Sequence, residues 1–142
     1  MTTYITYHST SECNIESILL NGFQDRFGEC YGLTFGKGVY TTTDLKYASS
    51  YNIECDKILE CEIVTENTIE LNVKEYKKNV KRIEKENPDL VVIKDANEFV
   101  CKNLCKIRVI SVLTVEKVLE KVLGQEQLVS VRILDRKNSI VS

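Results

Sequence analysis

Alternation of apolar and polar residues predicts β-strands in several stretches of the chain. The first, "TYITYHS", ends near His8, and the next, "KILECEIV", offers Ile58, Cys61 and Ile63 for burial. The later stretches that predict strands are "IELNV", "LVVI", "EFVC", "KIRVISVLTV" and "LVSVRIL". "LVVI" and "EFVC" are expected to form a hairpin. The pattern therefore predicts a fold dominated by antiparallel strands.

Helical spacing of apolar residues predicts two helices in the first half of the chain. In "ECNIESILLNGF" the apolar face comprises Cys13, Ile15, Ile18 and Leu19. Ser11 stands at the N-cap position of this helix, and Gly22 ends it as a C′ glycine does. Asp44 predicts the N-cap of a second, short helix from Leu45 to Tyr51. The stretch "QDRFGECYG" between them predicts a loop.

The second half of the chain predicts two further helices. The longer one, "VKEYKKNVKRIEKENP", repeats apolar positions at spacings of 3, 4 and 3 residues and is followed by Pro88. The shorter one, "VEKVLEKVL", is amphipathic and closed by Gly124. The sequence contains no repeat, low-complexity tract or linker. We therefore expect one α+β domain over residues 1–142, mostly antiparallel, with helices at its edges.

Composition narrows the class of protein. The chain has 142 residues, of which 43% are hydrophobic and 28% charged, so it can bury a core. The net charge of −2 does not favour general binding of nucleic acid. The lysine-rich helix at 74–85 is more typical of a solvated face. No apolar stretch is long enough to span a bilayer, and the start lacks the features of a secretory signal.

The six cysteines bear on cellular compartment and on metal binding. They stand at Cys13, Cys30, Cys55, Cys61, Cys101 and Cys105. None forms a C-x-x-C pair, and the single His8 does not complete a zinc-ligand set with them, so no metal site is expected. Together with the missing secretory signal, this predicts reduced thiols in an intracellular, cytoplasmic protein.

Taken one at a time, the polar and aromatic candidates for function are weak. His8 at a strand end is more often a packing or surface residue. Gly36 and Gly38 fit a turn that needs positive φ angles. A tyrosine such as Tyr40 is commonly half-buried in a core. Glu98 at the start of a strand is usually a surface residue. The order of these residues along the chain changes the interpretation.

That order resembles the catalytic core of the poly(ADP-ribose) polymerase-like ADP-ribosyltransferases. The matching blocks are "YHST", a helix ending in "NGF", "YGLTFGKGVY", "YASSY" and "NEFVCKNLCKIRVISVL", which together cover about residues 4 to 113. The most specific of them are the G-K-G-V-Y and N-E-F-V blocks, in this order after "YHST". The resemblance implies a split sheet and an H-Y-E triad formed by His8, Tyr40 and Glu98.

The resemblance also implies a role for each matching residue. His8 would hydrogen-bond a ribose hydroxyl of NAD+, and Tyr40 would pack beside the nicotinamide ribose. Tyr51, eleven positions after Tyr40, would stack on the nicotinamide ring. Glu98 would be the catalytic carboxylate. Ser9 replaces a glycine whose backbone holds the nicotinamide amide. Other residues implied to border the cofactor are Thr10, Gly32, Gly38 and Ala48.

Ala48 is a departure from the family pattern. The family usually has a serine here, three residues before the stacking tyrosine, and its hydroxyl bonds the nicotinamide carbonyl. Losing one neutral hydrogen bond costs on the order of 1 kcal/mol, or about fivefold in affinity. The sequence therefore predicts NAD+ binding of modest affinity.

The function implied is that of an NAD+-dependent ADP-ribosyltransferase. The short path from Tyr51 to Glu98 favours transfer of single units, because it leaves little room for a long acceptor-side loop. Two alternatives stay open: a catalytically silent relative that binds NAD+, ADP-ribose or a partner, and an NAD+ glycohydrolase. The acceptor is open as well, whether a protein side chain, the enzyme itself or a nucleic-acid end. No membrane partner and no N-terminal regulatory helical domain are expected, and nothing indicates the oligomeric state.

Overall fold

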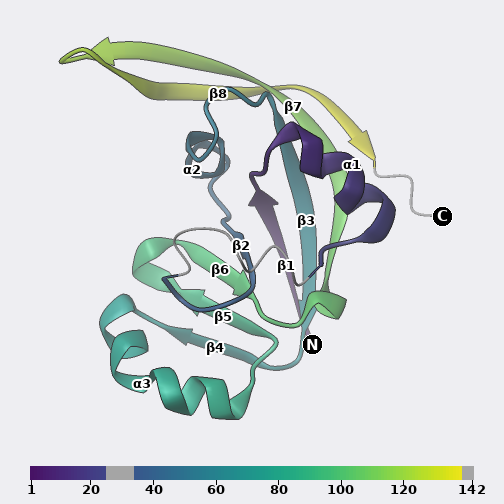
Figure 1. Ribbon diagram of the computed structural model, residues 1–142, viewed down its shortest axis with the longest axis vertical. Helices are drawn as coiled ribbons and strands as arrows, with labels where there is room; N and C mark the ends of the chain where they lie inside the picture. The colour runs from purple at the N-terminus through teal and green to yellow at the C-terminus, as the bar shows by residue number, and fades with distance from the viewer. Residues whose placement is uncertain (25–33, 139–142) are drawn as a thin grey trace.

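The computed structural model describes residues 1–24 and 34–138 (Figure 1). Its strands are β1 (Thr2–His8), β2 (Val39–Thr41), β3 (Lys57–Thr65), β4 (Thr68–Leu71), β5 (Leu90–Ile93), β6 (Glu98–Cys101), β7 (Ile107–Val122) and β8 (Gln125–Asn138). Its α-helices are α1 (Glu12–Asn21), α2 (Leu45–Ser50) and α3 (Val73–Glu86), and two 3-10 turns lie at η2 (Lys94–Ala96) and η3 (Leu104–Lys106).

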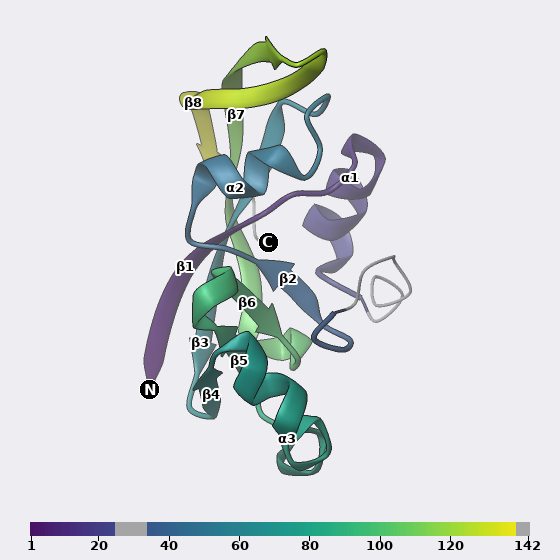
Figure 2. The same ribbon diagram turned by 90° about the vertical axis from the view of Figure 1, so that its left-hand side faces the viewer.

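The strands form two four-stranded sheets. One has the order β1-β3-β7-β8 and the other β2-β6-β5-β4. All neighbouring strands are antiparallel except β4 and β5, which are parallel. Figures 1 and 2 show α3 covering the second sheet, with α1 and α2 beside the first. The predicted α+β class and the split, mostly antiparallel sheet are confirmed.

The largest apolar cluster joins α1 to both sheets. The predicted positions Ile58, Cys61 and Ile63 on β3 are at most 1% exposed. Cys61 and Ile63 pack in this cluster with Ile15 and Ile18 of α1. A second cluster lies between the second sheet and α3, which contributes Tyr76 and Ile83 among others.

Helix α1 confirms the predicted element but not the whole of its predicted apolar face. Ile15 and Ile18 are buried, whereas Cys13 and Leu19 are exposed. The predicted apolar face is too wide, because a helix at the rim of a fold buries only the residues that point at the sheet. Gly22 ends the helix with a φ of 74°, as predicted.

Local caps fix the ends of the other two helices. The Asp44 carboxylate accepts hydrogen bonds from the backbone N–H groups of Lys46 and Tyr47, at 2.9 and 3.2 Å, so α2 begins where predicted. Asn72 and Glu75 form a reciprocal capping box at the start of α3. These caps favour helix formation in α2 and α3, although the neighbouring segments form strands.

The helix predicted at residues 115–123 is wrong. Strand β7 runs through this segment to Val122, turns at Leu123 and Gly124, and pairs with β8 along its length. Leu123 and Gly124 have φ angles of 53° and 82°, which suits a two-residue hairpin turn. Cross-strand partners such as Glu116 and Arg132 outweigh the local helical spacing.

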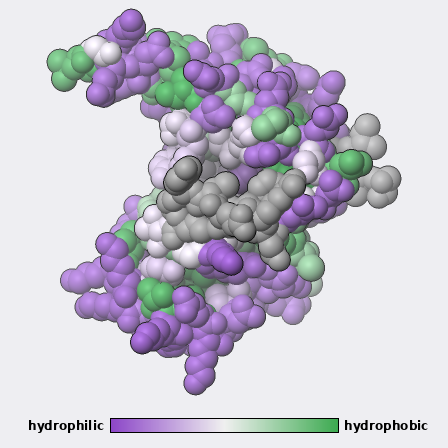
Figure 3. Space-filling view, in the orientation of Figure 1, coloured by the Kyte–Doolittle hydropathy of each residue, from purple (hydrophilic) through white to green (hydrophobic). Residues whose placement is uncertain are grey.

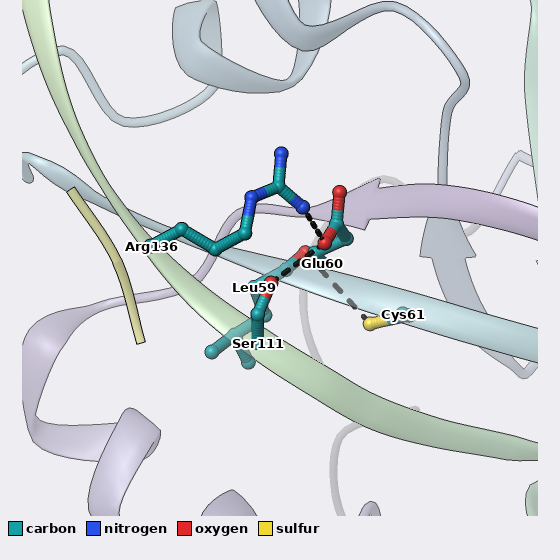
Figure 4. Close-up of polar contacts among 5 residues, drawn as sticks. All are labelled: Leu59, Glu60, Cys61, Ser111 and Arg136. Carbon is teal, nitrogen blue, oxygen red and sulfur yellow. Dashed lines mark hydrogen bonds and ion pairs between the residues drawn. The ribbon is translucent and has the colours of Figure 1, made fainter. Parts of the chain in front are cut away.

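A half-buried ion pair links the base of this hairpin to β3 within the first sheet. Figure 4 shows Arg136 of β8 and Ser111 of β7 converging on Glu60 of β3. The Ser111 hydroxyl donates to Glu60 Oε1 at 2.7 Å. The Glu60 side chain is 7% exposed. None of the described helices is both long and apolar enough to cross a membrane.

Candidate active site

Strand pairing brings the predicted site elements side by side. The end of β1 joins the residue after β2 through two hydrogen bonds between Tyr7 and Thr42, of 2.7 and 3.0 Å. Strand β2 in turn pairs with β6, with Tyr40 opposite Val100. His8 at the end of β1, Tyr40 in the middle of β2 and Glu98 at the start of β6 therefore stand on three neighbouring strands, although they lie far apart in the sequence.

His8 is fixed by the backbone of β2. Its ring nitrogen Nδ1 lies 2.8 Å from the carbonyl oxygen of Tyr40. A carbonyl only accepts, so Nδ1 carries the proton and Nε2 keeps a free lone pair in the neutral ring. Burial lowers the pKa of His8, and the bond to the Tyr40 carbonyl opposes this shift. Phe23 packs edge-on against the ring at 5.2 Å. Neutral His8 is thus set to accept a hydrogen bond through Nε2.

The hydroxyl of Tyr40 is also satisfied by backbone. It donates to the Gly36 carbonyl at 2.6 Å and accepts from the Phe35 N–H at 2.9 Å. Burial raises the pKa of Tyr40 to about 12, and the charge of Glu98 adds a smaller contribution in the same direction. With its hydroxyl held, the Tyr40 ring is fixed in place, and Phe35 stacks on it with ring centres 6.4 Å apart.

The close packing of β2 against β6 requires a glycine at position 38. Its φ is 152°, and a Cβ there would lie 2.7 Å from the Cys101 carbonyl oxygen and 2.9 Å from Val100 Cγ1. The missing side chain therefore lets β2 approach β6, which sets Tyr40 opposite Val100. This contact explains Gly38 without a ligand, and its contact with a cofactor stays a prediction.

Glu98 is held by two tyrosine hydroxyls from α2. The residue is 5% exposed, and its Oε1 accepts from the hydroxyl of Tyr51 and, at 3.1 Å, from that of Tyr47. Burial raises the pKa of Glu98, while the hydrogen bonds from Tyr51 and Tyr47 oppose the rise. Burial and the bond to Glu98 also raise the pKa of Tyr51. The two hydroxyl donors thus favour the charged form of a largely desolvated carboxylate and oppose the effect of burial.

Tyr47 is a site residue that the sequence did not point to. Tyr47 and Tyr51 are four residues apart on α2 and share one helix face, with ring centres 5.2 Å apart and hydroxyl oxygens 3.0 Å apart. This i, i+4 spacing was the available signal, but nothing local showed that Glu98 would lie between the two hydroxyls. Tyr51 is 59% exposed, so its ring also presents an open face.

A lysine from the C-terminal hairpin fixes the end of α2. Lys117 Nζ donates to three carbonyl oxygens, those of Ser49 at 3.0 Å, Asn52 at 2.6 Å and Ile53 at 3.3 Å. Helix C-termini leave such carbonyls without intrahelical partners. Burial lowers the pKa of Lys117. Since Tyr51 lies between these carbonyls, Lys117 helps to hold the tyrosine that contacts Glu98. Nothing in the sequence around Lys117 predicts this contact.

Other predicted site residues differ in how they are placed. Ala48 is 1% exposed and packs with Ile58, Leu113 and Val115, so the structure does not bring it to Glu98 or His8. Gly32 lies outside the described residues. Thr10 follows β1, and its hydroxyl accepts from the Asn14 amide at 3.3 Å.

Ser9 carries an orphaned polar atom beside His8. Its Oγ is buried and has no hydrogen-bond partner among the described residues. A buried hydroxyl without a partner is costly and points to a ligand or solvent group that satisfies it. Within residues 1–24 and 34–138, no group of three or more histidine, cysteine, aspartate or glutamate side chains is arranged to hold a metal ion.

Comparison with known proteins agrees with this geometry. The family model of the poly(ADP-ribose) polymerase catalytic domain matches residues 2–104. The matched range runs from β1 to η3 and includes every residue predicted for the site, whereas Lys117 lies beyond it. The search of curated proteins finds no significant match.

Proposed function

Because the chain belongs to the poly(ADP-ribose) polymerase catalytic-domain family, we propose that it cleaves the nicotinamide–ribose bond of NAD+ and transfers ADP-ribose to an acceptor. The observation that carries the proposal is the buried Glu98 carboxylate, which receives hydroxyl donors from Tyr47 and Tyr51. A carboxylate sheltered in this way is suited to meet positive charge that develops on a bound substrate.

The residues around Glu98 fit the nicotinamide half of NAD+. The exposed ring of Tyr51 supplies a stacking face, and the fixed ring of Tyr40 supplies a second flat surface. The Ser9 hydroxyl has no partner among the described residues and needs one. Nε2 of His8 can accept a hydrogen bond. In this proposal His8 accepts from a ribose hydroxyl, and Ser9 lies against the carboxamide.

The chemistry assigned to Glu98 is electrostatic. When the bond between the ribose C1′ and nicotinamide breaks, its electron pair leaves with nicotinamide and positive charge develops on the ribose. Glu98 stabilises that charge, as carboxylates do in glycosidases. The acceptor nucleophile then bonds to C1′ and gives up its proton. Charge stabilisation matters mainly in the transition state, so Glu98 acts on turnover more than on binding.

We further propose transfer of single units rather than chain growth. The stretch between Tyr51 and Glu98 is filled by β3, β4, α3, β5 and η2. Its irregular pieces are short, at 52–56, 66–67 and 87–89. This leaves no long loop in that stretch to hold a growing polymer end, which favours a single acceptor event.

Incubation with NAD+ labelled in the adenylate half tests the proposal. Wild-type protein is expected to release nicotinamide and to place label on itself or on an added acceptor as single units. Nicotinamide release with all of the label in free ADP-ribose would instead indicate a glycohydrolase. Binding of NAD+ with no nicotinamide release would indicate a silent relative. Glu98→Gln is the matched control, since it keeps the size of the side chain and removes its charge.

A further inference from the structure

The outer edge of β8 is the strongest feature outside the candidate site. β8 is the last strand of its sheet, and no other described strand pairs with its outer side. Figures 1 and 2 show the hairpin of β7 and β8 projecting as an arm beyond α2. Such an edge presents a row of backbone N–H and C=O groups that can pair with another strand.

The middle of this edge is apolar. Val129, Ile133 and Leu134 are 41%, 38% and 54% exposed. Arg132 is the one charged residue between positions 127 and 134, and its guanidinium bonds Glu116 of β7 at 2.8 Å. Figure 3 shows the arm overhanging a hollow, with apolar residues at its tip. Natural edge strands are usually protected by charges along their length, and the middle of this one carries Arg132 alone.

Apart from Arg132, the charges of β8 sit at its two ends, and their net signs are opposite. Glu126 lies at the start of the strand, whereas its end carries Asp135, Arg136 and Lys137, two basic residues against one acidic residue. Two copies of the strand running antiparallel would set each acidic start against the other copy's basic end. We propose that two copies of this chain associate by antiparallel pairing of their β8 edges, with Val131 of one copy opposite Val131 of the other.

The register follows from which face of the arm each β8 side chain occupies. Pairing with β7 places Gln127, Ser130, Arg132 and Asp135 on one face of the arm and Glu126, Val131 and Arg136 on the other. The irregularities of the ladder leave Val129 and Leu134 as the extra residues. Symmetric pairing about Val131 or about Arg132 matches the two faces of both copies. A centre at Arg132 would set two guanidiniums against each other, so the centre falls at Val131.

The cross-copy contacts in this register are complementary. Glu126 lies opposite Arg136 of the second copy, and Gln127 lies opposite Asp135. The Arg136 guanidinium has five N–H donors, so its bond to Glu60 leaves others for Glu126. Ser130 lies opposite Arg132 of the second copy. None of these contacts involves His8, Tyr40 or Glu98, although Val131 packs on the apolar cluster that contains Ala48.

Two lysine substitutions on the same face test the register. Ser130→Lys adds a positive charge opposite Arg132 of the second copy, whereas Gln127→Lys adds the same charge opposite Asp135. Both positions are exposed, so each variant is expected to fold. Each change occurs twice in a symmetric pair. Like charges directly opposite should raise the dimer dissociation constant of Ser130→Lys by about tenfold, while Gln127→Lys should leave it equal or lower.

Sedimentation equilibrium of the full chain at low salt measures these constants, with circular dichroism as the check on folding. A concentration-dependent dimer that weakens in Ser130→Lys but not in Gln127→Lys supports the proposal. Wild-type protein that stays monomeric up to its highest soluble concentration overturns it. A dimer that responds equally to the two variants, or to neither, overturns the assigned edge and register.

Discussion

The two sides of the candidate site hold their side chains by different means. On the His8 side, which comprises His8 and Tyr40, the polar groups bond backbone atoms of β2 and of its preceding turn. On the Glu98 side, which comprises Tyr47, Tyr51 and Glu98, side chains bond one another around a carboxylate. The geometry of the His8 side should therefore change little when Glu98 is protonated, while the hydrogen bonds of the Glu98 side should depend on that protonation.

Glu98→Gln should give the largest effect. The substitution keeps shape and hydrogen bonding but removes the charge that faces the reacting ribose. Loss of one well-placed electrostatic group costs about 10²–10³ in rate. We expect kcat to fall by that factor, with KM changing far less, in a nicotinamide-release assay. A folded variant that keeps more than about a third of wild-type turnover would remove Glu98, and with it the triad, from the mechanism.

Tyr40→Ala should affect binding and turnover together. The ring of Tyr40 is present before and during the reaction, so its loss weakens both states. The half-buried ring also packs on Phe35 and fixes the turn, and removing it should destabilise the fold by about 3 kcal/mol. Calorimetry with NAD+ and chemical denaturation measure the two losses. Unchanged NAD+ affinity would place Tyr40 outside the pocket.

Lys117→Met should loosen the Glu98 side from outside the matched domain. Three carbonyls lose their donor, and we expect a loss of about 2 kcal/mol in the free energy of unfolding. Turnover should fall more than NAD+ affinity, because Tyr51 would hold Glu98 less firmly. Lys121→Met, at an exposed position on the same strand, is the control. If both variants unfold at the same denaturant concentration as wild type, the three hydrogen bonds of Lys117 do not contribute to stability.

Removing single hydroxyls sharpens the comparison of the two sides. Tyr47→Phe takes away a donor that lowers the pKa of Glu98, so this pKa should rise. The charged form is then lost at higher pH, and the acidic limb of kcat should move upward. Tyr40→Phe removes only bonds to backbone, so it should cost stability and leave that limb in place. Equal pH profiles for the two variants would contradict the distinction.

Ala48→Ser should have the smallest effect. The methyl group packs against Ile58, Leu113 and Val115, so we expect an added hydroxyl to bond the Asp44 carbonyl one turn earlier and ligand affinity to change by less than about twofold. A few-fold tighter binding of nicotinamide-like ligands, about the value of one neutral hydrogen bond, would instead place residue 48 on the pocket as the family resemblance implies.

Much of this fold could be predicted because its determinants are local. The alternation in β3 and the Asp44 cap of α2 identify their elements within a few residues. The segment 115–123 could not be predicted in this way. Its valines and leucines fit a helix locally, and only pairing with β8 decides for a strand. The residue pattern within one segment carries no information about pairing with a distant strand.

The candidate site divides in the same manner. His8, Tyr40, Tyr51 and Glu98 could be found because a family motif preserves their order. Tyr47 and Lys117 could not, because each depends on a contact between distant elements. Tyr47 reaches Glu98 across 51 positions, and Lys117 reaches Ser49 across 68. Neither contact leaves a mark in the neighbouring sequence.

Titration of the Glu98 carboxyl carbon by NMR tests the distinction between the two sides most directly. Carbon-13 label in the glutamate side chains would be assigned to Glu98 by its loss in Glu98→Gln. We expect a pKa above the ordinary value of 4.5 in the wild type, a higher one in Tyr47→Phe, and an unchanged one in Tyr40→Phe. A Glu98 pKa at or below 4.5 would show that burial does not dominate at this carboxylate, and an equal shift in both tyrosine variants would show that Tyr47 has no specific control over its charge.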